Sequence, residues 1–376
     1  MEHLAPVFAQ YPIEVTSAAG VWLTTRDGRR ILDLYGGHAV AALGYGHAAW
    51  LAALDSQART VHFQSNAVPM EVRTRAARRL VEFSKLPLDT VFFVSTGAEA
   101  NENALKLACR VTGRAQVVAL EGSFHGRTAA AGAVTWGAMA KWYGFPRAPF
   151  DVAFLPRRDA SALGGVTDAT AAVIVEPVQG VGGAFDMGRD YLAALRARCD
   201  ETGALLIFDE VQCGMGRTGH PFAANLYGVM PDMITTAKAL GAGFPVGALL
   251  TGGRVRAALR PDALGTTFGG GPLACAVVTA VIDAIELEGL LENVRRVSRL
   301  IRETCVTGPV TGTQGEGFLL GLRTRRPAKE IHARLLERNI LAGTSGDPNV
   351  LRLLPPFTLD ASHVALLREA LAGIAA

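Results

Sequence analysis

The sequence predicts an α/β protein built on a mainly parallel, doubly wound sheet. Between about residues 50 and 255, apolar strand-like runs alternate with helical stretches. Several of these runs are apolar almost throughout, as strands are when both faces of their sheet are covered. With 49% apolar residues, 19% charged residues and 42 glycines, the chain has the composition of a packed globular protein. Its 376 residues are enough for a large domain and a smaller one.

Three segments make up the expected domain organisation. Residues 1–50 indicate a β-rich entry region, with strands at 20–25 and 31–34. Residues 51–260 form the large domain with the sheet. Residues 261–376 contain further helical and strand-like pieces, and we expect them to pack with the first segment as a smaller α/β domain.

Within the large domain the pattern predicts these strands: Thr90–Val94, Gln116–Leu120, Ala171–Glu176, Ala204–Asp209 and Met233–Thr236. The helices expected between them are Glu71–Phe83, Ala100–Val111 and Arg189–Thr202, and two more follow at about Pro272–Leu287 and Val294–Cys305. Ligands of such sheets bind at the carboxyl ends of the strands. Most of the polar residues discussed below follow those ends.

Composition also excludes several functions. A net charge of +3 is too small to indicate nucleic-acid binding. The start, Met1-Glu2-His3, lacks a signal peptide's basic and apolar regions, and no apolar run approaches the roughly 18 residues needed to span a bilayer. Five scattered cysteines without a CxxC pair, and histidines without HExxH spacing, argue against a metal. We therefore expect a cytoplasmic protein with reduced thiols and no metal.

Lys238 interrupts an apolar, strand-like run just before a glycine-rich turn, within the stretch 234–243. The chain contains five lysines against 32 arginines. A lysine kept at this position suggests chemistry that arginine cannot perform, because only the amine can lose its proton and act as a nucleophile. The structural alternative is a lysine that extends its ammonium to solvent from the end of a strand.

Two further strand ends carry polar features. Asp209 ends a buried strand, where a carboxylate needs a cation or a hydrogen-bond donor. A protonated pyridine nitrogen would be such a partner, and a helix cap or structural ion pair is the alternative. The segment 96–101 follows the strand at 90–94 and opens a helix, whose unpaired amides suit a phosphate.

Two loops complete the set of candidates. After the strand at 116–120, the ring of Phe124 could stack on a flat heterocycle, and Arg127 could hold a carboxylate with two hydrogen bonds. The segment 214–219 matches GxGxxG, but residues 210–213 separate it from the preceding strand. We interpret it as a flexible loop with an arginine rather than a dinucleotide site. A lysine, an aspartate, a helix N-terminus and an aromatic ring are together the parts needed to hold pyridoxal phosphate.

With these motifs in order over about residues 12–360, the chain resembles the class III (ω-amino acid) aminotransferases of the fold-type I pyridoxal phosphate enzymes. The motifs are Thr96-Gly97-Ala98-Glu99-Ala100-Asn101-Glu102, Phe124-His125-Gly126-Arg127-Thr128, Glu176-Pro177-Val178-Gln179-Gly180, Phe208-Asp209-Glu210-Val211-Gln212, Gly214-Met215-Gly216-Arg217-Thr218-Gly219, Thr236-Ala237-Lys238-Ala239-Leu240-Gly241 and Thr266-Thr267-Phe268-Gly269-Gly270. The resemblance implies the fold-type I architecture, with helices on both faces of the large sheet and a small domain made from both termini.

The resemblance also implies roles for individual residues. Lys238 would form the Schiff base with the cofactor and act as the general base, and Asp209 would keep the pyridine nitrogen protonated. The other cofactor contacts it implies are Gln212 to the ring hydroxyl, Phe124 over the ring, the amides of Gly97 and Ala98 to the phosphate, and Thr267 to the phosphate of the neighbouring subunit in a homodimer. The substrate contacts it implies are Arg127, Thr266, Glu176 and Arg352, the last for the α-carboxylate of glutamate or 2-oxoglutarate.

The expected reaction moves the terminal amine of an N-acylated ornithine, acetylornithine first, to 2-oxoglutarate, which gives a semialdehyde and glutamate. The alternative donors are succinylornithine, ornithine, 4-aminobutyrate and a carrier-linked lysine precursor. Decarboxylases and aminomutases share the scaffold. A cofactor-free binding protein is the alternative outside the enzymes, and a nicotinamide oxidoreductase would depend on the GxGxxG match alone.

Three positions depart from the family pattern. Ala98 stands where threonine is frequent, and His38 stands where many relatives carry an apolar residue. Val181 stands where relatives usually carry a glutamate that pairs with the arginine matching Arg352. We hypothesise that Val181 leaves Arg352 permanently available and so weakens the preference for ω-amine over α-amine donors.

Overall fold

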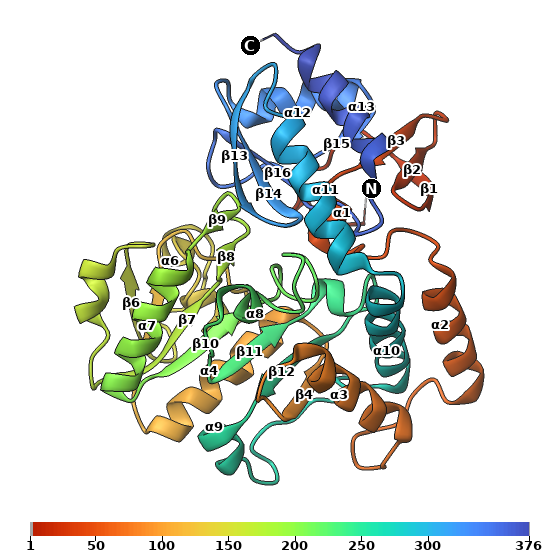
Figure 1. The fold of residues 1–376 in the computed structure, drawn as a ribbon. Coiled ribbons are helices and arrows are strands. Elements are labelled where there is room, and N and C mark those ends of the chain that lie inside the picture. The colour runs from red at the N-terminus through yellow and green to blue at the C-terminus, as the bar shows by residue number, and fades with distance from the viewer. Residues whose placement is uncertain (1–2, 376) are drawn as a thin grey trace.

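The computed structural model describes residues 3–375, which form two lobes, with a large sheet at the centre of one of them (Figure 1). The sheet has seven strands in the order β4-β12-β11-β10-β7-β5-β6. Their bounds are β4 Thr90–Val94, β5 Gln116–Leu120, β6 Asp151–Leu155, β7 Thr170–Val175, β10 Leu205–Asp209, β11 Met233–Thr236 and β12 Gly247–Thr251. All neighbouring pairs are parallel except those of β12, which runs antiparallel to both β11 and β4.

Both faces of the sheet are covered, as its apolar strands predicted. Successive residues of one strand belong to two different hydrophobic clusters: in β10, Leu206 and Phe208 pack in one cluster, and Leu205 and Ile207 pack in the other. Because side chains of a strand alternate between faces, one core lies on each side of the sheet. The mainly parallel, doubly wound architecture is therefore confirmed.

Helices surround this sheet and build the second lobe (Figure 1). Their bounds are α1 Gly36–Ala39, α2 Ala48–Thr60, α3 Glu71–Ser84, α4 Gly97–Thr112, α5 Ala129–Ala133, α6 Ala138–Lys141, α7 Arg189–Thr202, α8 Ala223–Tyr227, α9 Gly253–Ala257, α10 Pro272–Leu287, α11 Leu290–Thr304, α12 Ala328–Glu337 and α13 Ala361–Ala372. Two short 3-10 turns lie at Ala160–Gly165 and Lys238–Leu240.

The second lobe combines both ends of the chain. Its first sheet has the order β1-β2-β3-β15, so strands from the N-terminal region pair with one from the C-terminal region. Its second sheet has the order β13-β14-β16. The remaining strand bounds are β1 Val15–Ala19, β2 Trp22–Thr25, β3 Arg30–Asp33, β8 Val178–Gln179, β9 Phe185–Asp186, β13 Val310–Glu316, β14 Leu319–Thr324, β15 Ile340–Leu341 and β16 Val350–Leu353. The domain limits at residues 50 and 260 stay a prediction.

Several element boundaries differ from the sequence prediction for local physical reasons. Helix α4 begins at Gly97 rather than Ala100, because the Thr96 side chain accepts from the Glu99 amide and the Glu99 side chain closes a capping box. Helix α11 begins at Leu290 rather than Val294, directly after Gly289, which adopts φ 62°. Strands β6 and β12 were not predicted.

None of the helices described within residues 3–375 is both long enough and apolar enough to cross a membrane. In the same residues, no group of three or more histidine, cysteine, aspartate or glutamate side chains is placed to hold a metal ion.

Candidate active site

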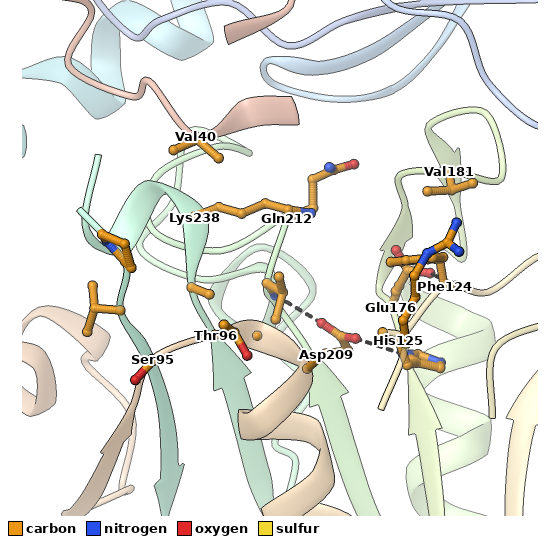
Figure 2. Close-up of a pocket in the computed structure, with 18 of the residues that line it drawn as sticks. Val40, Ser95, Thr96, Phe124, His125, Glu176, Val181, Asp209, Gln212 and Lys238 are labelled. Carbon is orange, nitrogen blue, oxygen red and sulfur yellow. Dashed lines mark hydrogen bonds and ion pairs between the residues drawn. The ribbon is translucent and has the colours of Figure 1, made fainter. Parts of the chain in front are cut away.

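A cavity of about 480 Å³ opens at the carboxyl ends of the sheet strands. The segments that line it follow β4, β5, β7, β10 and β11. Figure 2 shows Lys238 and Gln212 on one side of this pocket and Phe124, Glu176 and Val181 on the other, with Asp209 between them. The structure thus brings these side chains together at one edge of the sheet.

Asp209 is held in place by three donors. It is the last residue of β10 and is buried. Its Oδ2 accepts from His125 Nδ1 and from Asn101 Nδ2, both at 2.7 Å, and its Oδ1 accepts from the Val211 amide at 3.0 Å. A carboxylate only accepts, so His125 carries its hydrogen on Nδ1. Thr235 in turn donates to Asn101 Oδ1 at 2.6 Å, which fixes the orientation of that amide.

His125 and Asn101 are functional residues that the sequence analysis did not assign. Both lie inside motifs that were recognised, but only the fold brings them to Asp209. They orient the carboxylate and leave it facing the pocket that it lines.

Lys238 lies two residues beyond the end of β11 and opens a tight turn. Its backbone has φ 49°, a left-handed conformation that costs a side-chain-bearing residue about 1–2 kcal/mol. Burial lowers the pKa of the Lys238 ammonium, which Asp209 and Glu176 counteract and Arg352 reinforces. The lowered pKa favours the neutral amine, the form that acts as nucleophile and base.

Gln212 has one amide atom available for a ligand. Its Nε2 donates to the His38 carbonyl at 3.3 Å, and its buried Oε1 has no hydrogen-bond partner among the described residues. A Cβ on Gly180 would lie 1.7 Å from this oxygen, so only glycine leaves room for the side chain. Gln212 lines the pocket, and its unpaired acceptor suits a ligand hydroxyl.

The N-terminus of α4 forms an anion site at the same pocket. Thr96, Gly97 and Ala98 line the cavity, and the first amides of a 16-residue helix point outward without intrahelical partners. A Cβ on Gly97 would lie 2.7 Å from a Val211 methyl, so the chain packs closely here. This cradle, the fixed Asp209, the free Gln212 oxygen and the Lys238 amine match the phosphate, pyridine nitrogen, hydroxyl and aldehyde of pyridoxal phosphate.

Glu176 follows β7 and is buried below the Phe124 loop. Its carboxylate accepts from the Phe124 amide at 2.8 Å and from the Gly180 amide at 3.1 Å. Burial raises the pKa of Glu176 to about 7, with His125 opposing and Asp209 adding to the rise. Glu176 therefore shapes the loop that carries Phe124. Its predicted contact with substrate stays a prediction.

Arg352 lies on β16 and is a buried cation to which no carboxylate of the described residues is bonded. Its Nε donates to the Thr344 carbonyl at 2.7 Å, whereas its buried Nη1 has no partner among residues 3–375. Burial lowers the pKa of Arg352, opposed by the nearby Tyr35, Glu176 and Tyr11. A buried, partly unpaired guanidinium is costly, and an anionic ligand would relieve that cost.

His38, one of the three departures, lies close enough to Arg352 and Lys238 for their charges to affect it. Burial lowers the pKa of its imidazole to about 4, and the charges of Lys238 and Arg352 add to the effect. The ring is therefore neutral at pH 7, and it contacts the Tyr35 hydroxyl. Its effect on specificity stays a prediction.

The remaining predicted contacts, Arg127 and Thr266 to substrate and Thr267 to the partner's cofactor, are placed differently. Arg127 lines the pocket but is exposed, and its guanidinium stacks 4.4 Å from the centroid of a Trp142 ring. Thr266 and Thr267 do not line the pocket of their own chain. Thr266 Oγ1 accepts from the Gly269 amide at 3.1 Å, and Thr267 is exposed on the same loop.

The prediction of a flexible loop at 214–219 is wrong. Arg217 within it is fully buried at 0% exposure. Its guanidinium donates to the carbonyls of Pro355 and Ala39 and lies 4.6 Å from the centroid of the Phe357 ring. Two carbonyls and an aromatic face replace the water that a loop arginine usually keeps. Burial lowers the pKa of Arg217 to about 9.

Comparison with known proteins agrees with this geometry. The family model described as aminotransferase class-III matches residues 5–374. The chain is 40% identical to the acetylornithine aminotransferase of Mesorhizobium japonicum, over 97% of this chain and 94% of the relative. It is 42% identical to the acetylornithine aminotransferase of Streptomyces coelicolor, over 94% of this chain and 89% of the relative.

Solved structures show the same likeness. The ornithine aminotransferase of Toxoplasma gondii superposes with a TM-score of 0.92 at 26% identity and covers 99% of this chain and 92% of its own. The acetylornithine aminotransferase of Elizabethkingia anophelis superposes with a TM-score of 0.87 at 27% identity, over 98% of this chain and 96% of its own.

Proposed function

The chain belongs to the class III aminotransferases, and from that premise we propose that it transfers the terminal amine of acetylornithine to 2-oxoglutarate in the cytoplasm. As a member of this family it is a transaminase that depends on pyridoxal phosphate and takes an amino donor and a keto acid. Support for the donor comes from relatives at about 40% identity that carry the name acetylornithine aminotransferase. The single observation that carries the site assignment is Lys238 with its lowered pKa in the same cavity as the fixed Asp209.

The cofactor is held by four kinds of contact in this proposal. The amides of Gly97 and Ala98 would bind its phosphate, Asp209 would accept a hydrogen bond from its ring nitrogen, and the Gln212 oxygen would accept from its hydroxyl. Phe124 covers the ring. When bound, pyridoxal phosphate supplies the carbonyl carbon that takes the amine and a ring that withdraws electrons from the neighbouring carbon.

Proton transfer falls to Lys238. Burial lowers the pKa of its ammonium, which makes the neutral amine easier to form, and as the free amine Lys238 would remove the proton from the carbon that bears the donor's terminal amine. Asp209 stabilises positive charge on the ring nitrogen next to it, which favours the loss of that proton. Lys238 would then deliver this proton to the carbon that came from the cofactor's aldehyde, and hydrolysis would release the semialdehyde and leave the amine on the cofactor. The second half of the cycle would repeat these steps in reverse with 2-oxoglutarate, to give glutamate and restore the aldehyde.

The substrate carboxylate is assigned to Arg352. Its Nη1 is buried without a partner in the described part of the chain, and its Nε anchors it to the Thr344 carbonyl. A carboxylate that binds there satisfies the free donor and neutralises a buried charge at the same time. Arg127, held against Trp142 at the exposed side of the pocket, is placed to meet the polar end of a longer donor.

A homodimer with shared sites is the assembly that we propose. Helix α2 has 13 residues, all of them described, and none is buried. One of its exposed side chains, Leu51, is apolar. Phe268 is 68% exposed and stacks on Phe63 at 5.4 Å between ring centroids. Exposed aromatic side chains beside such a helix are typical of a subunit interface. Thr267, next to Phe268, would then reach the phosphate site of the partner subunit.

The test of the donor is a comparison of initial rates. Acetylornithine, succinylornithine, ornithine and 4-aminobutyrate are offered in turn with 2-oxoglutarate, and glutamate formation is measured. The proposal expects acetylornithine to give the highest kcat/KM. A higher value for any other donor would replace the substrate assignment, and binding of donors without glutamate formation would favour a binding protein on this fold.

A further inference from the structure

Helix α2 is attached to the protein by one stripe of its surface. His47, Trp50, Leu54 and Gln57 are partly buried, and their spacing of three or four residues places them on one face. The helix lies along the outside of α10 (Figure 1). At its start His47 Nε2 lies 2.9 Å from Glu288 Oε1. The position of α2 against the rest of the protein therefore depends on a few partly buried side chains.

Trp50 does more than pack within this stripe. Its indole Nε1 donates to the Gly241 carbonyl at 2.9 Å, across 191 residues of sequence. Gly241 belongs to the turn that begins at Lys238: its amide donates to the Lys238 carbonyl at 3.1 Å, as does the amide of Ala242. The Trp50 hydrogen bond thus joins α2 to the backbone that carries the reactive lysine.

That turn needs support from outside. Lys238 has φ 49° and Ala242 has φ 44°, so left-handed residues stand at both of its ends. Such conformations persist only where the surroundings hold them. A Cβ on Gly241 would lie 2.1 Å from the Phe244 carbonyl, so the chain is folded tightly on itself at this point. An external donor to the Gly241 carbonyl fixes where the turn lies.

We propose that Trp50 is a positioning residue for Lys238: its indole N–H holds the strained turn in place and so sets the direction in which the lysine enters the pocket. This inference rests on the role proposed above for Lys238. Charged and titratable groups face the Lys238 amine from both lobes, and these are Asp209, Glu176, Cys213, Arg352 and His38. A small change in the turn alters the distance to each of them.

The experiment uses the holoenzyme and measures a property other than turnover. The visible absorption of the cofactor bonded to Lys238 is recorded from acid to alkaline pH, and the midpoint of its change is compared between proteins. The main variant replaces Trp50 by 3-benzothienylalanine, which keeps the shape of indole but has sulfur in place of N–H. Trp50→Phe is the second variant, for use if the analogue does not incorporate.

The matched control is Leu54→Ala, which removes packing from the same stripe of α2 and leaves the hydrogen bond in place. Loss of the Trp50 donor is expected to relax the turn and shift the midpoint, upward or downward, by at least about half a pH unit. Leu54→Ala is expected to lower the Tm and leave the midpoint unchanged.

Three results would overturn the inference. The first is a midpoint in the Trp50 variants equal to that of the unmodified protein, with the fold retained by circular dichroism. The second is an equal shift in Leu54→Ala, which would make Trp50 a packing residue only. The third is an unmodified protein with no visible band, which removes the proposed role of Lys238 as well. In the first two results the proposed function still stands, because the unmodified enzyme titrates and turns over.

Discussion

Asp209 on the floor of the pocket and Arg352 in the second lobe above it differ in how fully their charged groups are hydrogen-bonded. On the floor, the Asp209 carboxylate receives three hydrogen bonds, and a second layer with Thr235 fixes one of the donors. Above the pocket, the second lobe supplies Arg352, which does not line the cavity but influences the pKa of Lys238, and its buried Nη1 has no partner within residues 3–375. One group is fully satisfied before a ligand arrives, and the other is not.

This difference in hydrogen bonding corresponds to two roles, stabilising charge on a bound cofactor and binding substrates. A group that stabilises charge on a bound ring works best when it is oriented in advance, because no reorganisation is then needed during the reaction. A group that binds substrates which come and go must keep donors free for them. The two halves of the site thus correspond to a permanent cofactor and exchanging substrates. Substitutions on the floor are expected to affect every substrate, and substitutions on the upper side to affect substrates selectively.

The largest effect is expected for Lys238→Ala. The variant loses both the nucleophile and the base, so transamination should fall by at least about 10⁴-fold for every donor. The measurement is glutamate formation at saturating donor, with cofactor content and circular dichroism checked in parallel. Retention of a tenth of the activity would remove Lys238 from the chemistry.

Asp209→Asn should come next. The amide cannot balance a positive charge on the ring nitrogen. Its NH₂ group would also face the donors of His125 and Asn101, which now donate to the carboxylate. We expect kcat to fall by roughly 10³-fold, by a similar factor for each donor and for 2-oxoglutarate. A loss confined to one substrate would contradict the division between floor and upper side.

Arg352→Lys tests the upper side. The charge is kept, but the planar fork that binds a carboxylate with two hydrogen bonds is lost. We expect kcat/KM for 2-oxoglutarate to fall by about 10²-fold, mostly through KM, from the loss of roughly 3 kcal/mol of charged hydrogen bonding. Asp209→Asn serves as the comparison, because its loss should appear in kcat. An unchanged KM for 2-oxoglutarate would place the substrate carboxylate elsewhere.

Val181→Glu is expected to give the smallest effect. Val181 lines the pocket, and its carbonyl accepts at 2.8 Å from Gly346, in the same loop as the Thr344 carbonyl that binds Arg352. A glutamate at this position could pair with the free Nη1 and reduce the access of α-carboxylates. The ratio of kcat/KM for acetylornithine to that for glutamate should rise about tenfold, the result of roughly 1.4 kcal/mol. No change in this ratio would end the hypothesis about donor preference.

The sequence predicted the parts of the site that lie next to regular elements. Lys238 and Asp209 end or follow apolar strands, and Phe124 lies four residues beyond one, so their clustering followed from the parallel sheet alone. The remaining assignments to cofactor and substrate came from the resemblance to a family. The strands β4, β5 and β11 were predicted with the bounds they have, because each is a short apolar run.

What the sequence did not predict depends on contacts between distant segments. Asn101 and His125 reach Asp209 across 108 and 84 residues, and no local pattern marks them as its donors. Arg217 is buried because carbonyls from both ends of the chain, at Ala39 and Pro355, meet at its guanidinium. Strand β12 was missed because the prediction relied on strands that alternate with helices, whereas β12 follows β11 after a turn and runs back beside it.

The most direct test of the account is the identity of the lysine that carries the cofactor. The purified protein is reduced with borohydride, digested, and mapped by mass spectrometry for peptides that carry the reduced cofactor. With five lysines in the chain, every candidate can be observed. The account predicts modification of Lys238, with loss of the visible absorption. Modification of Lys85, Lys106, Lys141 or Lys329 instead, or of none, would contradict it.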